Sequence, residues 1–191
     1  MTDKFNQEGN IVGRDQAGRD VIHNTTNNYS LDPTRPTYMH ALIEKFKKER
    51  ASDKTFNDIV EKLRHYWPPV AGETIVGLEE KLKAGGYEHL IPFAQQTKEL
   101  FVKKLAKHQF SETAQTIHAY LLAEVFSRFH THITPLIHSQ SSQEKINDAI
   151  QGRIIDPFRE ILEENVLELY ADEINGMLYF LTGNCHIKWI K

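Results

Sequence analysis

Residues 111–133 have the sequence SETAQTIHAYLLAEVFSRFHTHI, the most apolar helical pattern in the chain. The serine that opens it is a favoured N-cap, because its hydroxyl accepts a hydrogen bond from an amide of the first turn. Apolar residues then recur at helical spacing on more than one stripe: Ile117, Leu121, Leu122, Val125, Phe126, Phe129 and Ile133. A helix that is apolar around much of its surface must be covered by other elements. We therefore predict that 111–133 is a central helix, ended or kinked by Pro135.

Further helical patterns flank this segment on both sides. Their expected starting points are a proline, a capping residue or a glycine: Pro36, Ser52 or Asp53, Gly77, Pro92, Ser141 and Asp156. A last helix is expected over 174–181, where Gly183 and Asn184 stop the apolar pattern. The predicted fold class is therefore mainly α, a single helical-bundle domain over 37–191 that follows a linker over 31–36.

The end of the chain departs from the helical pattern. Cys185, Ile187 and Trp189 alternate with His186, Lys188 and Ile190, which predicts a short C-terminal β-strand. A strand needs a partner for its open hydrogen-bonding edge. Internal pairing with an extended segment near 75–76 and strand addition by another protein both remain open.

The N-terminus contains a repeat with a period of five residues. Residues 13–17 (GRDQA) are followed directly by 18–22 (GRDVI). A glycine every five residues suits neither a helix nor an ordinary strand but does suit a repeated β-turn, because glycine accepts positive φ. The segment 1–30 is thus predicted to be a Gly/Asp-rich β-turn repeat, and the alternative is a disordered Asn- and Gly-rich tail.

The repeat places like residues in columns. Val12, Ala17 and Ile22 fall into one apolar column, with Arg14 over Arg19 and Asp15 over Asp20. Burying the Val and Ile side chains contributes roughly 3–6 kcal/mol, whereas ordering the backbone costs about 1–2 kcal/mol per residue. One copy should not stay folded alone. We expect several copies to wind around a shared axis, giving a homo-oligomer of three-fold or higher order.

Composition restricts the class of protein. The chain has 191 residues, a formal net charge of −3 and one cysteine, so it can form no intrachain disulfide. The net charge argues against a protein built chiefly to bind nucleic acid. The first thirty residues lack the apolar core of a signal peptide, and no stretch approaches 18 consecutive apolar residues. We expect a soluble, cytoplasmic protein.

No catalytic, cofactor or metal site is predicted. His130 and His132 are two residues apart, which points their rings to different sides of a helix, and His118 and His132 are four turns apart. Neighbouring Cys185 and His186 would face opposite sides of a strand. No phosphate loop, dinucleotide fingerprint or Gly-x-Ser-x-Gly elbow occurs. The basic runs at 45–50 and 103–107 are typical of solvated helix faces.

Several stretches resemble the C-terminal domain that accompanies three-component ABC-ATPase conflict systems of bacteria. They are residues 77–82; Ala94 with Lys98, Glu99 and Phe101; Ala114, Gln115, Ile117 and Tyr120; Ile133 and Pro135; and above all 176–189, GMLYFLTGNCHIKW. The resemblance spans about 38–191. It implies a domain that links effectors to the ATPase machinery of a defence system, often after a glycine–aspartate repeat and an effector domain.

Only eight residues precede the repeat and its lead-in, so the effector is expected to be a separate protein. The resemblance then implies a non-enzymatic adaptor or scaffold in an antiviral or plasmid-conflict system, with an ABC-type ATPase, a separate effector, or both as partners. The alternative is a sensor that binds nucleic acid or a small ligand through the helical domain. The candidate partner contacts are Asn184, Cys185, His186, Lys188 and Trp189. A purely structural role explains these residue types equally well.

Overall fold

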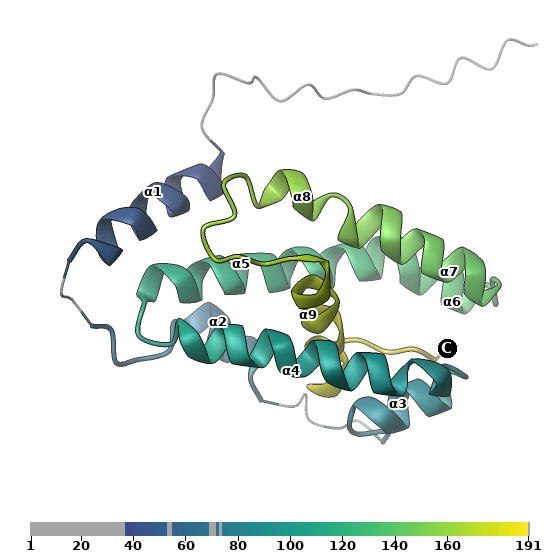
Figure 1. Ribbon diagram of the computed structural model, residues 1–191. Helices are drawn as coiled ribbons and strands as arrows, with labels where there is room; N and C mark the ends of the chain where they lie inside the picture. The colour runs from purple at the N-terminus through teal and green to yellow at the C-terminus, as the bar shows by residue number, and fades with distance from the viewer. Residues whose placement is uncertain (1–36, 53–54, 69–71, 73, 191) are drawn as a thin grey trace, which may run out of the picture. The chain divides into compact units, whose positions relative to one another are not determined.

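The computed structural model describes residues 37–52, 55–68, 72 and 74–190. All of them belong to one compact unit, Pro36–Lys191. This part of the chain is mainly helical, as the sequence predicts (Figure 1). The repeat over 1–30 and the linker over 31–36 lie outside the described residues.

The unit consists of helices joined by short connections. Its α-helices are α1 (Tyr38–Arg50), α2 (Glu61–Tyr66), α3 (Leu78–Ala84), α4 (Ile91–Lys107), α5 (Glu112–Arg128), α6 (Thr134–His138), α7 (Gln143–Ile150), α8 (Phe158–Ile161) and α9 (Ala171–Gly183). The shorter turns are a 3-10 turn, η1 (Glu88–Leu90), and two π-helical turns, η2 (Phe129–Ile133) and η3 (Gln151–Ile155).

Helix α5 is central, as predicted. It contacts α1, α2 and α9, and Figure 1 shows it between α1 and α8 on one side and α4 on the other. The Ser111 hydroxyl accepts a hydrogen bond from the Ala114 amide at 3.0 Å, which confirms the predicted cap. The helix widens into η2 and continues as α6, which contains Pro135. The missing amide and the ring of a proline disturb the preceding turn, and the regular helix of α5 ends at Arg128, before Pro135.

Helix α9 packs against α4 more extensively than any other pair of elements. In Figure 1 α9 is seen nearly end-on between α4 and α5. Gly176 lies at the crossing with α4. A Cβ at this position would lie 2.7 Å from Phe101 Cβ and closer still to the Thr97 carbonyl oxygen. Both helices therefore approach to a distance that only glycine permits.

One predicted helix start is wrong, and one predicted helix is shorter than expected. The helix expected from Ser52 or Asp53 begins only at Glu61, and the described residues 55–60 are irregular. A glutamine from α5 binds their backbone, as described below. The helix expected from Asp156 begins at Phe158, directly after Pro157, but α8 is only one turn long and ends at Ile161.

The C-terminal strand is not confirmed, since the described residues 185–190 contain no strand. The amides of His186 and Ile187 both donate to the Leu181 carbonyl, at 2.9 and 3.3 Å. The carbonyl of Ile187 accepts from Lys81 Nζ at 3.3 Å. Cys185 has a φ of 66°, which interrupts an extended conformation. The end of α9 and a buried lysine thus satisfy backbone groups that a neighbouring strand would otherwise bind.

Replacing Gly176 by alanine tests the helix crossing. We expect Gly176→Ala to lower the free energy of unfolding by about 2–4 kcal/mol, because α9 must move away from the Thr97 carbonyl. Gly152→Ala is the matched control, since no atom lies within 4 Å of its added Cβ. Urea denaturation followed by circular dichroism measures both. Equal stability of the two variants would contradict the close crossing.

Candidate functional site

The segment 184–190, called the tail from here on, is held by an interior tryptophan. Trp189 is 1% exposed, and its indole nitrogen donates to the Thr182 hydroxyl at 3.0 Å. Its ring stacks on Tyr179 with centroids 6.3 Å apart and meets the Tyr87 ring at 4.9 Å. A Cβ on Gly85 would lie 2.9 Å from Trp189 Cβ, so α3 ends directly against the tail.

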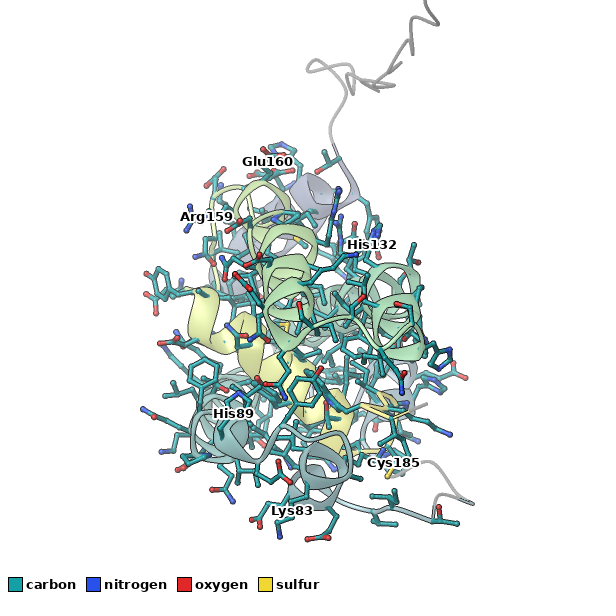
Figure 2. All side chains as sticks on the ribbon, turned by 90° about the vertical axis from the view of Figure 1, so that its right-hand side faces the viewer. Lys83, His89, His132, Arg159, Glu160 and Cys185 are labelled. Carbon is teal, nitrogen blue, oxygen red and sulfur yellow. The ribbon has the colours of Figure 1, made fainter. Side chains whose placement is uncertain are left out.

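The other predicted contact residues of the tail are covered to different degrees: Cys185 is buried, and Asn184 and His186 are partly buried. Asn184 Nδ2 donates to the Tyr66 carbonyl at 2.9 Å, and Cys185 is buried at the end of the unit that also carries Lys83 (Figure 2). Burial, with a smaller contribution from nearby His65, lowers the pKa of His186. Lys188 is exposed. These positions favour the structural interpretation of the tail, and a partner contact there stays a prediction.

The residues predicted to mediate oligomerisation all lie outside the described part of the chain: Val12, Arg14, Asp15, Ala17, Arg19, Asp20 and Ile22. Their assignment stays a prediction.

The structure contains a surface feature that sequence reasoning missed, an apolar groove beside α4. Its volume is about 400 Å³. One wall comes from residues 56–67 and the other from the end of α4 and the start of α5. The lining residues are Phe56, Asn57, Asp58, Ile59, Leu63, Trp67, Val102, Leu105, Ala106, Gln109, Phe110 and Gln115. We call this feature the α4 groove.

One buried glutamine of α5 builds the irregular wall of the α4 groove. Gln115 Oε1 accepts from the Val60 amide at 2.8 Å. Its Nε2 donates to the carbonyls of Asp58 and Gln109, at 2.8 and 2.6 Å. Buried polar groups left without partners are costly. The bonds to Val60 and Asp58 therefore fix the segment 55–60 against α5, and the bond to Gln109 ties the residues just after α4 to the same side chain. No local sequence signal distinguishes Gln115, because α5 carries several other polar residues, among them Thr113 and His118, which are also buried.

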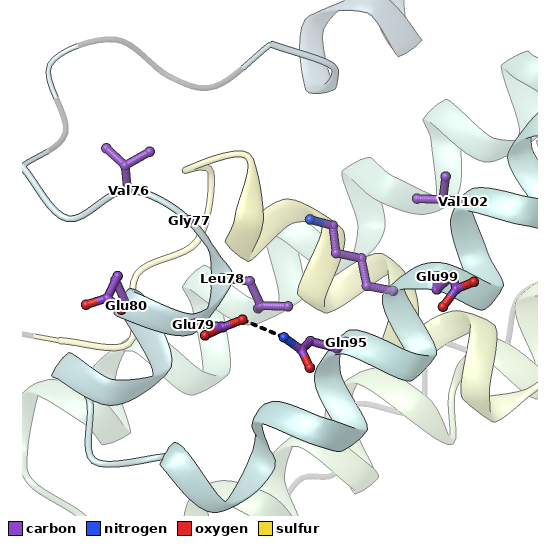
Figure 3. A pocket seen from close by; sticks show the side chains of 9 residues that line it. Val76, Gly77, Leu78, Glu79, Glu80, Gln95, Glu99 and Val102 are labelled. Carbon is purple, nitrogen blue, oxygen red and sulfur yellow. Dashed lines mark hydrogen bonds between the residues drawn. The ribbon is translucent and has the colours of Figure 1, made fainter.

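A second, more open hollow of about 590 Å³ continues from the α4 groove along α4. Val102 lines both. Figure 3 shows Val76 and Val102 on two sides of this hollow, and Gln95 Nε2 donates to Glu79 at 2.5 Å. Its lining is more polar than that of the groove: Val76, Gly77, Leu78, Glu79, Glu80, Gln95, Lys98, Glu99 and Val102. We call it the acidic hollow, because it has three carboxylates and one lysine.

Exposed apolar side chains gather around these two cavities. Among the described residues, eight large hydrophobic side chains are exposed, and five of them line the groove or the hollow: Ile59, Trp67, Val76, Val102 and Phe110. Trp67 is 49% and Phe110 56% exposed. A contiguous exposed apolar patch with polar surroundings is typical of an interaction site.

Lysines of the two basic runs form ion pairs with carboxylates of the loop between α8 and α9. Lys47 Nζ lies 2.7 Å from a Glu164 oxygen. Lys104 and Lys107 both pair with Glu168, at 3.4 and 3.7 Å. Glu168 also has a lowered pKa, chiefly because Lys104 donates to its carboxylate. These faces therefore give no specific support to the nucleic-acid alternative.

The histidines that the structure describes do not assemble into a metal site. Within the described ranges, no group of three or more His, Cys, Asp or Glu side chains is placed to hold a metal ion. His118 is fully buried beside Phe101. Its Nδ1 lies 2.8 Å from the Ala114 carbonyl, and burial lowers its pKa to about 4. It is therefore a neutral core residue at pH 7. No helix in the part of the chain that the structure describes is long and apolar enough to span a membrane.

A family model matches residues 77–189, from the residue before α3 to the tail tryptophan. It describes C-terminal domain 9 of the ABC-three component (ABC-3C) systems. The match covers more than half of the chain and includes α4, every lining residue of the hollow except Val76, and the tail up to Trp189. The comparisons with curated proteins and with solved structures give no match.

Gln115→Leu should loosen the wall of the α4 groove. The substitution leaves the Val60 amide and two carbonyls without their partner, so we expect a loss of about 2–4 kcal/mol of stability. Hydrogen exchange at the Val60 amide should accelerate more than global unfolding accounts for. The exposed Gln96 of α4 is the control, since Gln96→Leu should change stability by about 0.5 kcal/mol or less. Unchanged exchange at Val60 would contradict the proposed wall.

The tail is tested by truncating each of the two tryptophans. We expect Trp189→Ala to cost about 3–5 kcal/mol, because it leaves a cavity in the core and removes the hydrogen bond that the Thr182 hydroxyl accepts. Trp67→Ala is the matched control and should cost about 1–2 kcal/mol, because half of that side chain is already exposed. Denaturation of both variants measures the difference. A Trp189 variant as stable as the Trp67 variant would show that the tail is not anchored.

Proposed function

The chain belongs to the family of C-terminal domain 9 of the ABC-three component systems, and on that premise we propose that it is a non-enzymatic adaptor of such a conflict system. In this proposal the helical unit docks a protein partner, and the N-terminal repeat assembles several copies. The partners are the ABC-type ATPase of the system and a separate effector.

The observation that carries this proposal is the concentration of exposed apolar side chains at the α4 groove. Trp67 and Phe110 offer aromatic area that folding leaves accessible. Aromatic residues in the apolar centre of a contact, with polar residues around it, dominate the binding energy of many protein interfaces. Asn57, Asp58 and Gln109 supply such a polar edge here.

Assembly through the repeat complements a groove of modest size. A partner that presents several binding segments gains affinity when several grooves are held together, because every contact after the first is intramolecular. The repeat supports this role through its five-residue period and its apolar column at 12, 17 and 22. Oligomerisation and docking are thus two parts of one proposal that can be tested separately.

Oligomerisation is tested in the full chain by light scattering coupled to gel filtration. We expect a multiple of the monomer mass for the wild type, and a smaller species for the double variant Val12→Asp with Ile22→Asp. Burying two aspartates in the apolar column would be costly, since no partner charge is present in it.

Val21→Asp is the matched control, because Val21 belongs to the same repeat but lies outside the column. This variant should keep the wild-type mass. A wild-type monomer, or a double variant with unchanged mass, would remove the repeat from the account.

A further inference from the structure

We propose that the α4 groove and the acidic hollow together bind one amphipathic helix of the ABC ATPase component, with an apolar half in the groove and a basic end in the hollow. This inference rests on the proposed adaptor function and specifies the occupant of its docking surface. It is carried by three features of the described residues: the spacing of the lining residues on α4, the apolar lining of the groove, and the charge of the hollow.

The lining residues of α4 form a stripe along one side of that helix. They are Gln95, Lys98, Glu99, Val102, Leu105 and Ala106. Their spacing of three, four and seven residues is that of one helix face. At a rise of about 1.5 Å per residue the stripe, from 95 to 106, is about 17 Å long. That length suits a partner helix of about three turns packed along α4.

The alternative of an added strand lacks a template here. A peptide that binds as a strand needs an open sheet edge. The described residues on either side of the groove are helical or irregular and contain no strand. A helix needs no such edge, because it satisfies its own backbone and contributes side chains alone.

The apolar half of the site can accept two or three large side chains. Ile59, Trp67 and Phe110 stand at the opening of the groove and are exposed. Ala106 in its lining is small, which leaves room next to Val102 for a side chain of the partner. Apolar residues at positions i, i+3 or i+4, and i+7 of a partner helix would fill this half.

The polar half of the site favours a basic end on the same helix. Glu79, Glu80 and Glu99 line the hollow, with Lys98 as its single cation. Their internal partners are solvent-exposed: Lys83 lies 2.9 Å from Glu80, and Lys103 lies 2.6 Å from Glu99. Each of the three carboxylates is half or more exposed. A lysine or arginine from a partner can therefore reach them without displacing buried groups.

The test uses the full chain and the purified ABC ATPase of the same system, with binding measured by calorimetry. We expect Val102→Glu and Trp67→Ala to weaken binding about tenfold or more, because each removes apolar contact from the centre of the site. The controls are Gln96→Glu, on α4 outside both cavities, and Tyr170→Ala, an exposed aromatic elsewhere. Both controls should bind like the wild type.

A second arm tests the helix and its charge. Overlapping synthetic peptides that cover the ATPase sequence are titrated into the full chain. The peptide that binds should become helical by circular dichroism and carry a basic residue at one end. Glu99→Lys should weaken this peptide about tenfold at low salt and less at high salt. Glu144→Lys, a charge reversal on α7, is the control.

Each failure has a distinct meaning. If the ATPase binds the groove variants as tightly as the wild type, the groove is not its site and the inference is wrong, while the adaptor function stands. If only a purified effector occupies the groove, or if the bound peptide stays extended, the proposal of an ATPase helix as the occupant is wrong. If neither ATPase nor effector binds the wild type, the proposed function fails together with the inference.

Discussion

The close approach of α9 to α4 at Gly176 is the contact on which the rest of the unit depends. It brings the α9 backbone against Phe101 and the Thr97 carbonyl. The Thr97 hydroxyl donates within its own helix to the Phe93 carbonyl at 2.9 Å, so the crossing contains no unsatisfied hydroxyl. With this side of α4 covered, the neighbouring stripe from 95 to 106 is left to line the groove and the hollow.

Helix α9 also connects the tail to the groove. The side-chain amide of Asn184, the residue just past the helix, donates to the Tyr66 carbonyl at the end of α2. Tyr66 is followed directly by Trp67. The Trp67 ring centroid lies 6.1 Å from that of Phe180 in α9, and about half of the Trp67 side chain remains exposed. The segment 176–189, which most closely resembles the family, therefore supports the groove wall from inside. The segment 176–189 therefore contributes to recognition indirectly, because it positions residues that a partner would touch.

The sequence predicts helix starts and ends correctly where the residues that determine them are neighbours in the chain. The Ser111 cap, the start of α4 near Pro92, and the end of α9 at 183–184 all follow from neighbouring residues, and the structure confirms them. The α2 start could not be predicted in this way, since Gln115, more than fifty residues away, holds the segment 55–60 out of a helix. The alternation at 185–190 indicated a strand, but long-range bonds to Leu181 and Lys81 take up the backbone groups instead.

The groove itself was beyond sequence reasoning for the same reason. Its walls come from two segments, 56–67 and 102–115, and only tertiary packing brings them together. Trp67 and Phe110 lie near the ends of predicted helices, where an aromatic residue is equally suited to the core. Their exposure distinguishes them from Trp189, and exposure is a property of the fold rather than of the local pattern.

The central claim is that a partner covers Trp67 and leaves the tail undisturbed. Fluorine NMR of the full chain labelled with fluorotryptophan tests it directly, because the chain has two tryptophans and thus gives two assignable resonances. On addition of saturating, unlabelled ABC ATPase, the account predicts that the Trp67 resonance shifts and the Trp189 resonance keeps its position. A bound complex in which Trp67 is unchanged, or in which Trp189 alone moves, would contradict it.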